Sequence, residues 1–289
     1  MVTTVNAGFE SLKSNLEITD LQQSTVSTRQ NNVRDAVEKE LLVLNSFLTG
    51  SYAKSTMISP LKEADIDIFI VLDPKYYNSE HPECVLDKVR NTLLKTYTTS
   101  KISRNGQAVT ITFGDFIVDV VPAFNRKGGG YLIANSYTKK WISTDPTISA
   151  DLLASENKNH IGDLVPLIKM IKGWNKASGS LFVSFYLELI AIELLKGVTI
   201  SNFHSGVRFF FDKGRTRIKN KVKDPAGFGD YINPLRKDLK IQTVEDAIKA
   251  FETAYEIAIQ AENYARNNNN SKAIDEWKKI FGSYFPSYG

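Results

Sequence analysis

The aspartates Asp65, Asp67 and Asp119 are the residues whose type and spacing point most directly to chemistry. Side chains two residues apart on a β-strand point to the same face, so a strand through this segment presents Asp65 and Asp67 together. Asp119 stands alone between two valines in a second strand-like run. Where the two strands are neighbours in one sheet, three carboxylates converge, and we expect them to act in catalysis.

Three close carboxylates form a site for hard divalent cations. They repel one another and raise one another's pKa unless cations neutralise them. Oxygen ligands suit Mg²⁺ (or Mn²⁺), which binds through a few carboxylates together with substrate phosphates. Two such ions about 4 Å apart clamp the attacking and leaving oxygens of a phosphoryl transfer. The sequence therefore predicts a site for two ions at these aspartates.

The pair Gly50-Ser51, upstream of the aspartates, supplies groups that bind phosphate. Glycine lets the backbone approach a phosphate closely, and N–H groups and a serine hydroxyl at a helix start donate to its oxygens. Lys54 and Thr56 follow closely enough to reach the same phosphates.

Each of these pieces also has a purely structural explanation. A Gly-Ser pair before a helix is commonly an N-cap, and an Asp-x-Asp strand is commonly a solvated face. An aspartate between apolar residues is harder to explain, because an unpaired buried carboxylate is costly. The joint order favours catalysis: Gly-Ser, a spacer of 13 residues, Asp-x-Asp and a later aspartate.

The composition is that of a globular protein of one large or two small domains. Of 289 residues, 42% are hydrophobic and 24% are charged. A single cysteine excludes an internal disulfide, three scattered histidines form no metal cluster, and the net charge of +4 does not by itself indicate nucleic-acid binding. Neither a secretory signal nor a bilayer-spanning segment is visible, so we expect a soluble, cytoplasmic protein without membrane contact.

The expected elements change from strands to helices along the chain. The apolar spacing predicts a helix over 29–48, a strand over 64–72, a helix over 82–97, and strands over 108–113 and 116–121. Gly114-Asp115 predicts a two-residue hairpin turn of type II′ between the last two strands. From 163 onward the period is helical, with segments over 164–174, 181–195, 244–265 and 273–281. This order indicates an α+β fold.

The joint pattern resembles that of the polymerase β-like nucleotidyltransferase superfamily. Within it, GSYAKSTMISPLKEADIDIFIVLD closely resembles the bacterial cGAS/DncV-like nucleotidyltransferases, the second-messenger synthases of CBASS anti-phage systems. The likeness continues through segments 128–146, 164–179, 184–195, 224–232 and 277–286.

The resemblance implies a fold and a domain division. It implies a palm of mixed β-sheet with flanking helices, a C-terminal helical lobe, and an active site in the cleft between them. We expect the catalytic core, with an N-terminal helix, over 1–160 and the helical lobe over 161–289.

The resemblance also implies roles for the motif residues. Gly50 and Ser51 would hold the donor triphosphate, and Asp65 and Asp67 the metal ions. Asp119 would complete the metal site and help to activate the attacking hydroxyl.

Three residues of the helical half are further candidates by resemblance. Lys172 matches a lysine that relatives direct at a phosphate, Ser184 matches a polar nucleotide contact, and Phe185 would stack on a base. The alternatives are a solvated lysine, an N-cap serine and a core phenylalanine.

The segment 208–223 carries seven basic residues and one acidic residue. It is either a solvated loop, a positive rim that offsets triphosphate charge, or, with Phe209, Phe210 and Phe211, a nucleic-acid patch. A chain with one cysteine cannot build the zinc-bound insertion that helps animal cyclic GMP-AMP synthase sense DNA, so DNA activation is not implied.

The resemblance predicts an enzyme that joins ribonucleoside triphosphates, ATP and other NTPs, into a cyclic oligonucleotide that reaches a CBASS effector. The alternatives are a linear oligonucleotide synthase (2′-5′-oligoadenylate synthase-like or a tailing polymerase), a catalytically silent nucleotide-binding scaffold, and a relative of aminoglycoside nucleotidyltransferases. The terminal Gly289 would suit conjugation by a ubiquitin-transfer-like partner, as in some CBASS operons; the alternative is a chain end without such a role.

Overall fold

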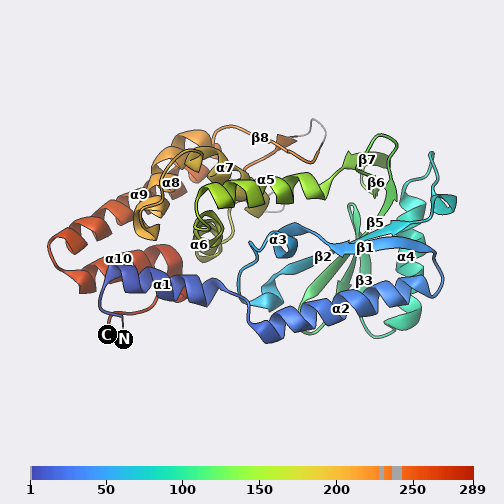
Figure 1. Cartoon of the computed structure of the whole chain (residues 1–289), viewed down its shortest axis with the longest axis horizontal. Helices are drawn as coiled ribbons and strands as arrows, with labels where there is room; N and C mark the ends of the chain where they lie inside the picture. Colours follow the sequence, from blue (N-terminus) through green and yellow to red (C-terminus); the bar gives the residue numbers. More distant parts are fainter. Residues whose placement is uncertain (1, 228–230, 236–242) are drawn as a thin grey trace. The chain divides into compact units, whose positions relative to one another are not determined.

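The computed structural model describes residues 2–227, 231–235 and 243–289, and the chain divides into two compact units (Figure 1). The first, which we call the sheet unit, consists of Ile18–Asp151 and Pro225–Phe228. The second, which we call the helical unit, consists of Met1–Glu17, Leu152–Asp224 and Gly229–Gly289.

The sheet unit is built on one mixed sheet. Its strands lie in the order β1 (Val43–Leu48), β2 (Asp65–Leu72), β5 (Ile117–Asn125), β4 (Ala108–Thr112) and β3 (Lys101–Asn105), and β6 (Tyr131–Asn135) and β7 (Lys140–Thr144) extend from the end of β5. The pairing of β2 with β5 is parallel, whereas β1 with β2 and β4 with β5 are antiparallel. The mixed sheet with flanking helices confirms the predicted fold class.

Two helices cover one face of this sheet. They are α2 (Asp20–Glu38) and α4 (Glu83–Thr96), whose apolar residues share one buried cluster with β2, β4 and β5 (Figure 1). The alternation of β2 explains why, because Ile66, Ile68 and Ile70 are fully buried on that face. The opposite face of β2 therefore carries Asp65 and Asp67.

The prediction of one helix over 29–48 is wrong in its second half. The helix α2 ends at Glu38, and Val43–Leu48 is strand β1, in which Leu48 lies opposite Ile68 of β2. The apolar residues of this segment have helical spacing, but the segment forms a strand because it pairs with β2. The helix also begins earlier than predicted, at a capping box in which Thr19 and Gln22 satisfy each other's backbone N–H groups.

The predicted hairpin over 108–121 is confirmed, with a different turn. Thr112 lies opposite Ile117, and the Phe113 N–H donates to the Phe116 carbonyl at 3.1 Å. Gly114 does not have the positive φ that a type II′ turn requires at its first central position, so that turn type is wrong.

The helical unit confirms the periodicity of the second half. It contains α1 (Val5–Leu16), α6 (Leu164–Ala177), α7 (Ser184–Leu195), α8 (Phe203–Arg217), α9 (Val244–Arg266) and α10 (Asn270–Phe281), with a small pair of strands β8 (Val222–Lys223) and β9 (Tyr231–Ile232). Helix α5 (Pro146–Asn159) leads into it from the sheet unit. Within the described residues, no helix combines the length and apolarity needed to cross a membrane.

Helix α1 packs in the helical unit, whereas the sequence-based division grouped it with residues 1–160. Phe9 of α1 is buried and makes edge-to-face contacts with Trp277 and Phe285 from the end of the chain. The two termini meet there (Figure 1), since the Val2 N–H donates to the Gly289 carbonyl at 2.9 Å.

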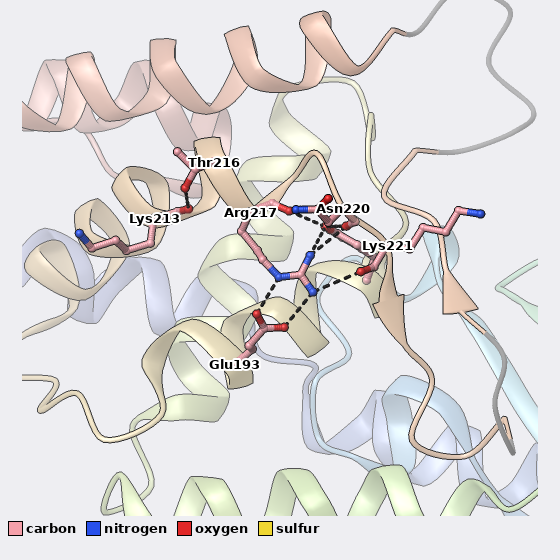
Figure 2. Close-up of polar contacts among 7 residues, drawn as sticks. Glu193, Lys213, Thr216, Arg217, Asn220 and Lys221 are labelled. Atoms are coloured by element: carbon pink, nitrogen blue, oxygen red, sulfur yellow. Dashed lines mark hydrogen bonds and ion pairs between the residues drawn. The ribbon is translucent and has the colours of Figure 1, made fainter.

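Arg217, the last residue of α8, binds Glu193 of α7, as Figure 2 shows. Its guanidinium donates to both carboxylate oxygens of Glu193, at 2.7 and 2.8 Å, and to the Asn220 carbonyl at 2.9 Å. The planar fork of arginine matches a carboxylate in this two-point manner. Arg217 therefore has a structural task within the basic segment 208–223.

We expect Arg217→Lys to lower the free energy of unfolding of the protein by about 1–2 kcal/mol. Lysine keeps the charge but cannot make the paired bonds to Glu193 while also reaching the Asn220 carbonyl. Urea denaturation followed by circular dichroism measures the change. The control is Lys219→Ala, at an exposed lysine with no ion pair among the described residues, which should leave stability within about 0.5 kcal/mol. Equal stability of Arg217→Lys and wild type would contradict the assignment.

Candidate active site

The parallel pairing of β2 and β5 places Asp67 directly opposite Asp119. Asp65 precedes Asp67 by two residues on the same face and lies opposite Ile117. Asp67 and Asp119 are half-buried, and Asp65 is exposed. The structure thus brings together the carboxylates that the sequence singled out.

The environment of these carboxylates disfavours their charged forms. Burial raises the pKa of Asp67 to about 7, and the charges of Asp119 and Asp65 add to the shift, while Lys54 opposes it. Burial also raises the pKa of Asp119, and a hydrogen bond from the Thr110 hydroxyl works in the other direction. A bound cation would relieve both the burial penalty and the repulsion.

The donor set fits Mg²⁺ shared with a substrate. In the described part of the chain, no three or more His, Cys, Asp or Glu side chains come close enough to hold a metal ion by themselves. Mg²⁺ seldom uses such all-protein cages, because it keeps several waters and binds through one or two carboxylates plus substrate phosphates. Asp67 and Asp119, with Asp65 beside them, are suited to that mode.

Gly50 is packed against Asp67. It follows β1 with φ +63°, a conformation that favours glycine, and a Cβ atom there would lie 1.9 Å from Asp67 Oδ2. The neighbouring Thr49 N–H donates to the Asp67 carbonyl at 2.9 Å. Two features of the structure therefore require glycine at position 50, namely the left-handed backbone conformation and the close approach to the Asp67 carboxylate.

Ser51 begins the turn that follows Gly50, in the short helix α3 (Gly50–Ala53). Its carbonyl accepts from the N–H groups of Thr56 and Met57 at 2.9 and 3.1 Å, and its half-buried hydroxyl donates to no residue in the described ranges. Lys54 lies near enough for its charge to act on Asp67. Thr56 is fully buried, so of this group it is the one least accessible to a substrate.

Lys172, Ser184 and Phe185 lie in the helical unit. Lys172 on α6 forms a buried ion pair with Glu188 on α7, with 3.1 Å between Nζ and Oε2. Ser184 is the exposed first residue of α7, and its predecessor Val183 occupies the N-cap position, so Ser184 is not the cap. Phe185 is half-buried. Their roles toward a nucleotide stay predictions.

The basic segment 208–223 is largely engaged in ion pairs within the helical unit. Arg208 pairs with Glu262 at 3.0 Å, and Arg215 pairs with Asp212. Phe210 and Phe211 are fully buried. Phe210 and Phe211 therefore cannot contribute to the nucleic-acid patch that was one interpretation of this segment, because their rings belong to the core.

Thr110 is a site residue that the sequence analysis did not single out. It lies on β4 opposite Asp119, and its hydroxyl donates to Asp119 Oδ1 at 2.5 Å. The signal that identifies it is the register of the predicted hairpin, since a two-residue loop at 114–115 aligns 110 with 119.

Comparisons with known proteins identify relatives over the whole chain. Residues 3–157 match the Second Messenger Oligonucleotide or Dinucleotide Synthetase domain. The chain is 26% identical to a probable cyclic nucleotide synthase of Bacillus cereus (strain VD146), over 100% of this chain and 99% of that protein. It is 25% identical to a cyclic AMP-AMP-AMP synthase of Acinetobacter sp. (strain ATCC 27244 / 9458), over 99% and 86%.

A solved structure shares the fold at lower identity. The E. coli MS115-1 CdnC structure with ATP aligns with a TM-score of 0.73 and 17% identity, over 98% of this chain and 99% of that one. This likeness covers both the sheet unit and the helical unit, and confirms the predicted nucleotidyltransferase fold with its C-terminal helical part.

We expect Asp67→Asn to stabilise the metal-free protein at pH 8 more than at pH 5. The pKa of Asp67 is higher in the folded than in the unfolded chain, so stability is lost as pH rises from about 4 to about 7. The neutral asparagine removes that loss. Thermal unfolding in EDTA at both pH values measures it, with the exposed Asp151→Asn as control. An equal change at both pH values would contradict the assigned cause.

We expect Gly50→Ala to lose most turnover, because the new methyl group must displace the Asp67 carboxylate. Left-handed backbone alone costs a non-glycine residue about 1–2 kcal/mol of stability. Gly128→Ala separates the two effects, since Gly128 has φ +93° but no atom within 4 Å of the added Cβ. Turnover and melting temperature of both variants are to be compared. Equal turnover in the two would show that the contact with Asp67 is unimportant.

Proposed function

The chain belongs to the second messenger oligonucleotide or dinucleotide synthetase family, and we propose that it joins ribonucleoside triphosphates into a cyclic oligonucleotide with release of pyrophosphate. The observation that carries the proposal is the pairing of Asp67 with Asp119, with Gly50 packed against Asp67. Joining nucleotides by phosphoryl transfer uses acidic metal ligands together with a backbone that can approach the substrate phosphates closely.

The proposed roles follow the chemistry of each side chain. Asp65, Asp67 and Asp119 would hold Mg²⁺ or Mn²⁺, two ions, which when bound lower the pKa of the attacking hydroxyl and stabilise the leaving pyrophosphate. Gly50 and Ser51 would contact the donor triphosphate, Ser51 through its hydroxyl. Asp119 would in addition orient the attacking hydroxyl.

Lys172, Ser184 and Phe185 remain proposed nucleotide contacts, and the surroundings of Lys172 suggest a second task. Its ammonium balances the buried Glu188, and removing one partner of such a pair leaves an uncompensated charge. A Lys172→Ala variant therefore tests stability as well as nucleotide affinity.

ATP is the first substrate to test, because the Acinetobacter relative is named for a product made only of AMP units. A cyclic product would act on a CBASS effector in the cytoplasm. Conjugation through Gly289 stays a proposal. The conjugating protein would have to break the two backbone hydrogen bonds between Gly289 and Val2, which measure 2.9 and 3.1 Å.

Incubation of the purified protein with each NTP pair and Mg²⁺ or Mn²⁺, followed by mass spectrometry, tests the function. We expect a product that resists phosphatase, because a ring has no terminal phosphates. A phosphatase-sensitive ladder would favour the linear synthase, and no product with any NTP would favour the silent scaffold.

The site residues are tested in the same assay. Asp67→Asn and Asp119→Asn should each remove most turnover, and the double variant should add little, because the residues act as one unit. Ser51→Ala should have a smaller effect, corresponding to about 1.5–3 kcal/mol for one charge-assisted hydrogen bond. Asp151→Asn is the control. Near-normal turnover of Asp67→Asn would refute the assignment.

A further inference from the structure

A row of polar side chains crosses the sheet beside the catalytic pair. Ser103 of β3 lies opposite Thr110 of β4, Thr110 opposite Asp119 of β5, and Asp119 opposite Asp67 of β2. Directly opposite residues point to the same face of a sheet. The four residues therefore form one row, and the next residues along each strand point to the apolar face.

Within this row, Thr110 is bonded to a carboxylate proposed to bind metal. Its Oγ1 donates to Asp119 Oδ1 at 2.5 Å. Threonine is restricted about its first side-chain torsion, so the donor has a defined position. The bond uses one oxygen of Asp119 and leaves Oδ2 for another ligand.

The neighbour of Asp119 on the β2 side is a second carboxylate. Asp67 lies on the opposite side of Asp119 from Thr110, and the charge of Asp119 acts on it. Without a partner on β4, the half-buried Asp119 carboxylate would be free to rotate away from this neighbour. A donor on the far side fixes which oxygen is presented.

We propose that Thr110 is a positioning residue that orients the Asp119 carboxylate for divalent-cation binding. The inference rests on the proposed function of Asp119 as a metal ligand. Hydrogen-bond partners of ligating carboxylates commonly set metal affinity, and their loss costs about 10–100-fold in affinity or activity.

The alternative is an ordinary cross-strand contact that only stabilises the sheet. Two variants separate these roles. Thr110→Val keeps the shape and branching but removes the donor, whereas Thr110→Ser keeps the donor and removes the methyl group. Thr112→Val is the matched control, an exposed threonine on the same strand and face whose hydroxyl bonds to no residue within the described ranges.

The experiment measures Mn²⁺ binding by each full-length variant, from the electron paramagnetic resonance signal of free Mn²⁺, together with kcat and KM for ATP. We expect Thr110→Val to bind Mn²⁺ about 10-fold or more weakly and to lose kcat with little change in KM. Thr110→Ser should recover most of both losses, and Thr112→Val should match wild type.

Three results would overturn the proposal. The first is wild-type Mn²⁺ affinity in Thr110→Val, the second is a Thr110→Ser variant as impaired as Thr110→Val, and the third is absence of Mn²⁺ binding by wild type. If Thr110→Val does not fold, Thr110→Ala takes its place. If wild type makes no product from any NTP, the proposed function fails, but the Mn²⁺ comparison still decides the role of Thr110.

Discussion

The parallel pairing of β2 with β5 is the interaction on which the rest of the site depends. Its register sets Asp67 beside Asp119, and burial raises the pKa of both carboxylates, so the pairing has a cost in folding free energy. The other face of the same strands offsets that cost. Ile68 and Val118 are fully buried against α2 and α4, and each such side chain contributes about 1.5–3 kcal/mol. The alternation of the strands thus gives stability to one face and chemistry to the other.

The segment that we propose to bind phosphate is built from the same register. Strand β1 ends where its backbone meets Asp67, and the Thr49 N–H donates to the Asp67 carbonyl. The chain then turns through Gly50, whose lack of a side chain leaves room for the Asp67 carboxylate. The motif glycine and the motif aspartate therefore constrain each other, and Ser51 follows Gly50 directly in the chain.

Sequence patterns within short segments predicted most of the local secondary structure. The Asp-x-Asp alternation gave the face of β2, and the hairpin over 108–121 gave a register from which Thr110 follows. The adjacency of Asp67 and Asp119 required a parallel pairing of strands far apart in the chain, which periodicity cannot supply. Pairing with β2 also makes Val43–Leu48 a strand, although the helical spacing of its apolar residues predicted a helix. The place of α1 depends on Phe9 meeting aromatic residues from the chain's end, and no local pattern contains that contact.

The burial and mutual repulsion of these carboxylates link ligand binding to stability. The folded sheet unit disfavours ionised Asp67, so under the proposed function a cation bound with its triphosphate would neutralise the carboxylates and stabilise the folded state, whereas the unfolded chain would gain no comparable stability. A ligand that binds only the folded state stabilises it by about 2.7 kcal/mol at a concentration of 100 Kd. The cost of assembling the carboxylates is therefore greatest without substrate and is offset by the ligand. Under the proposed function, a site arranged in this way would favour metal-bearing nucleotides over neutral molecules of the same shape, because the metal ions would neutralise the charge that β2 and β5 bring together.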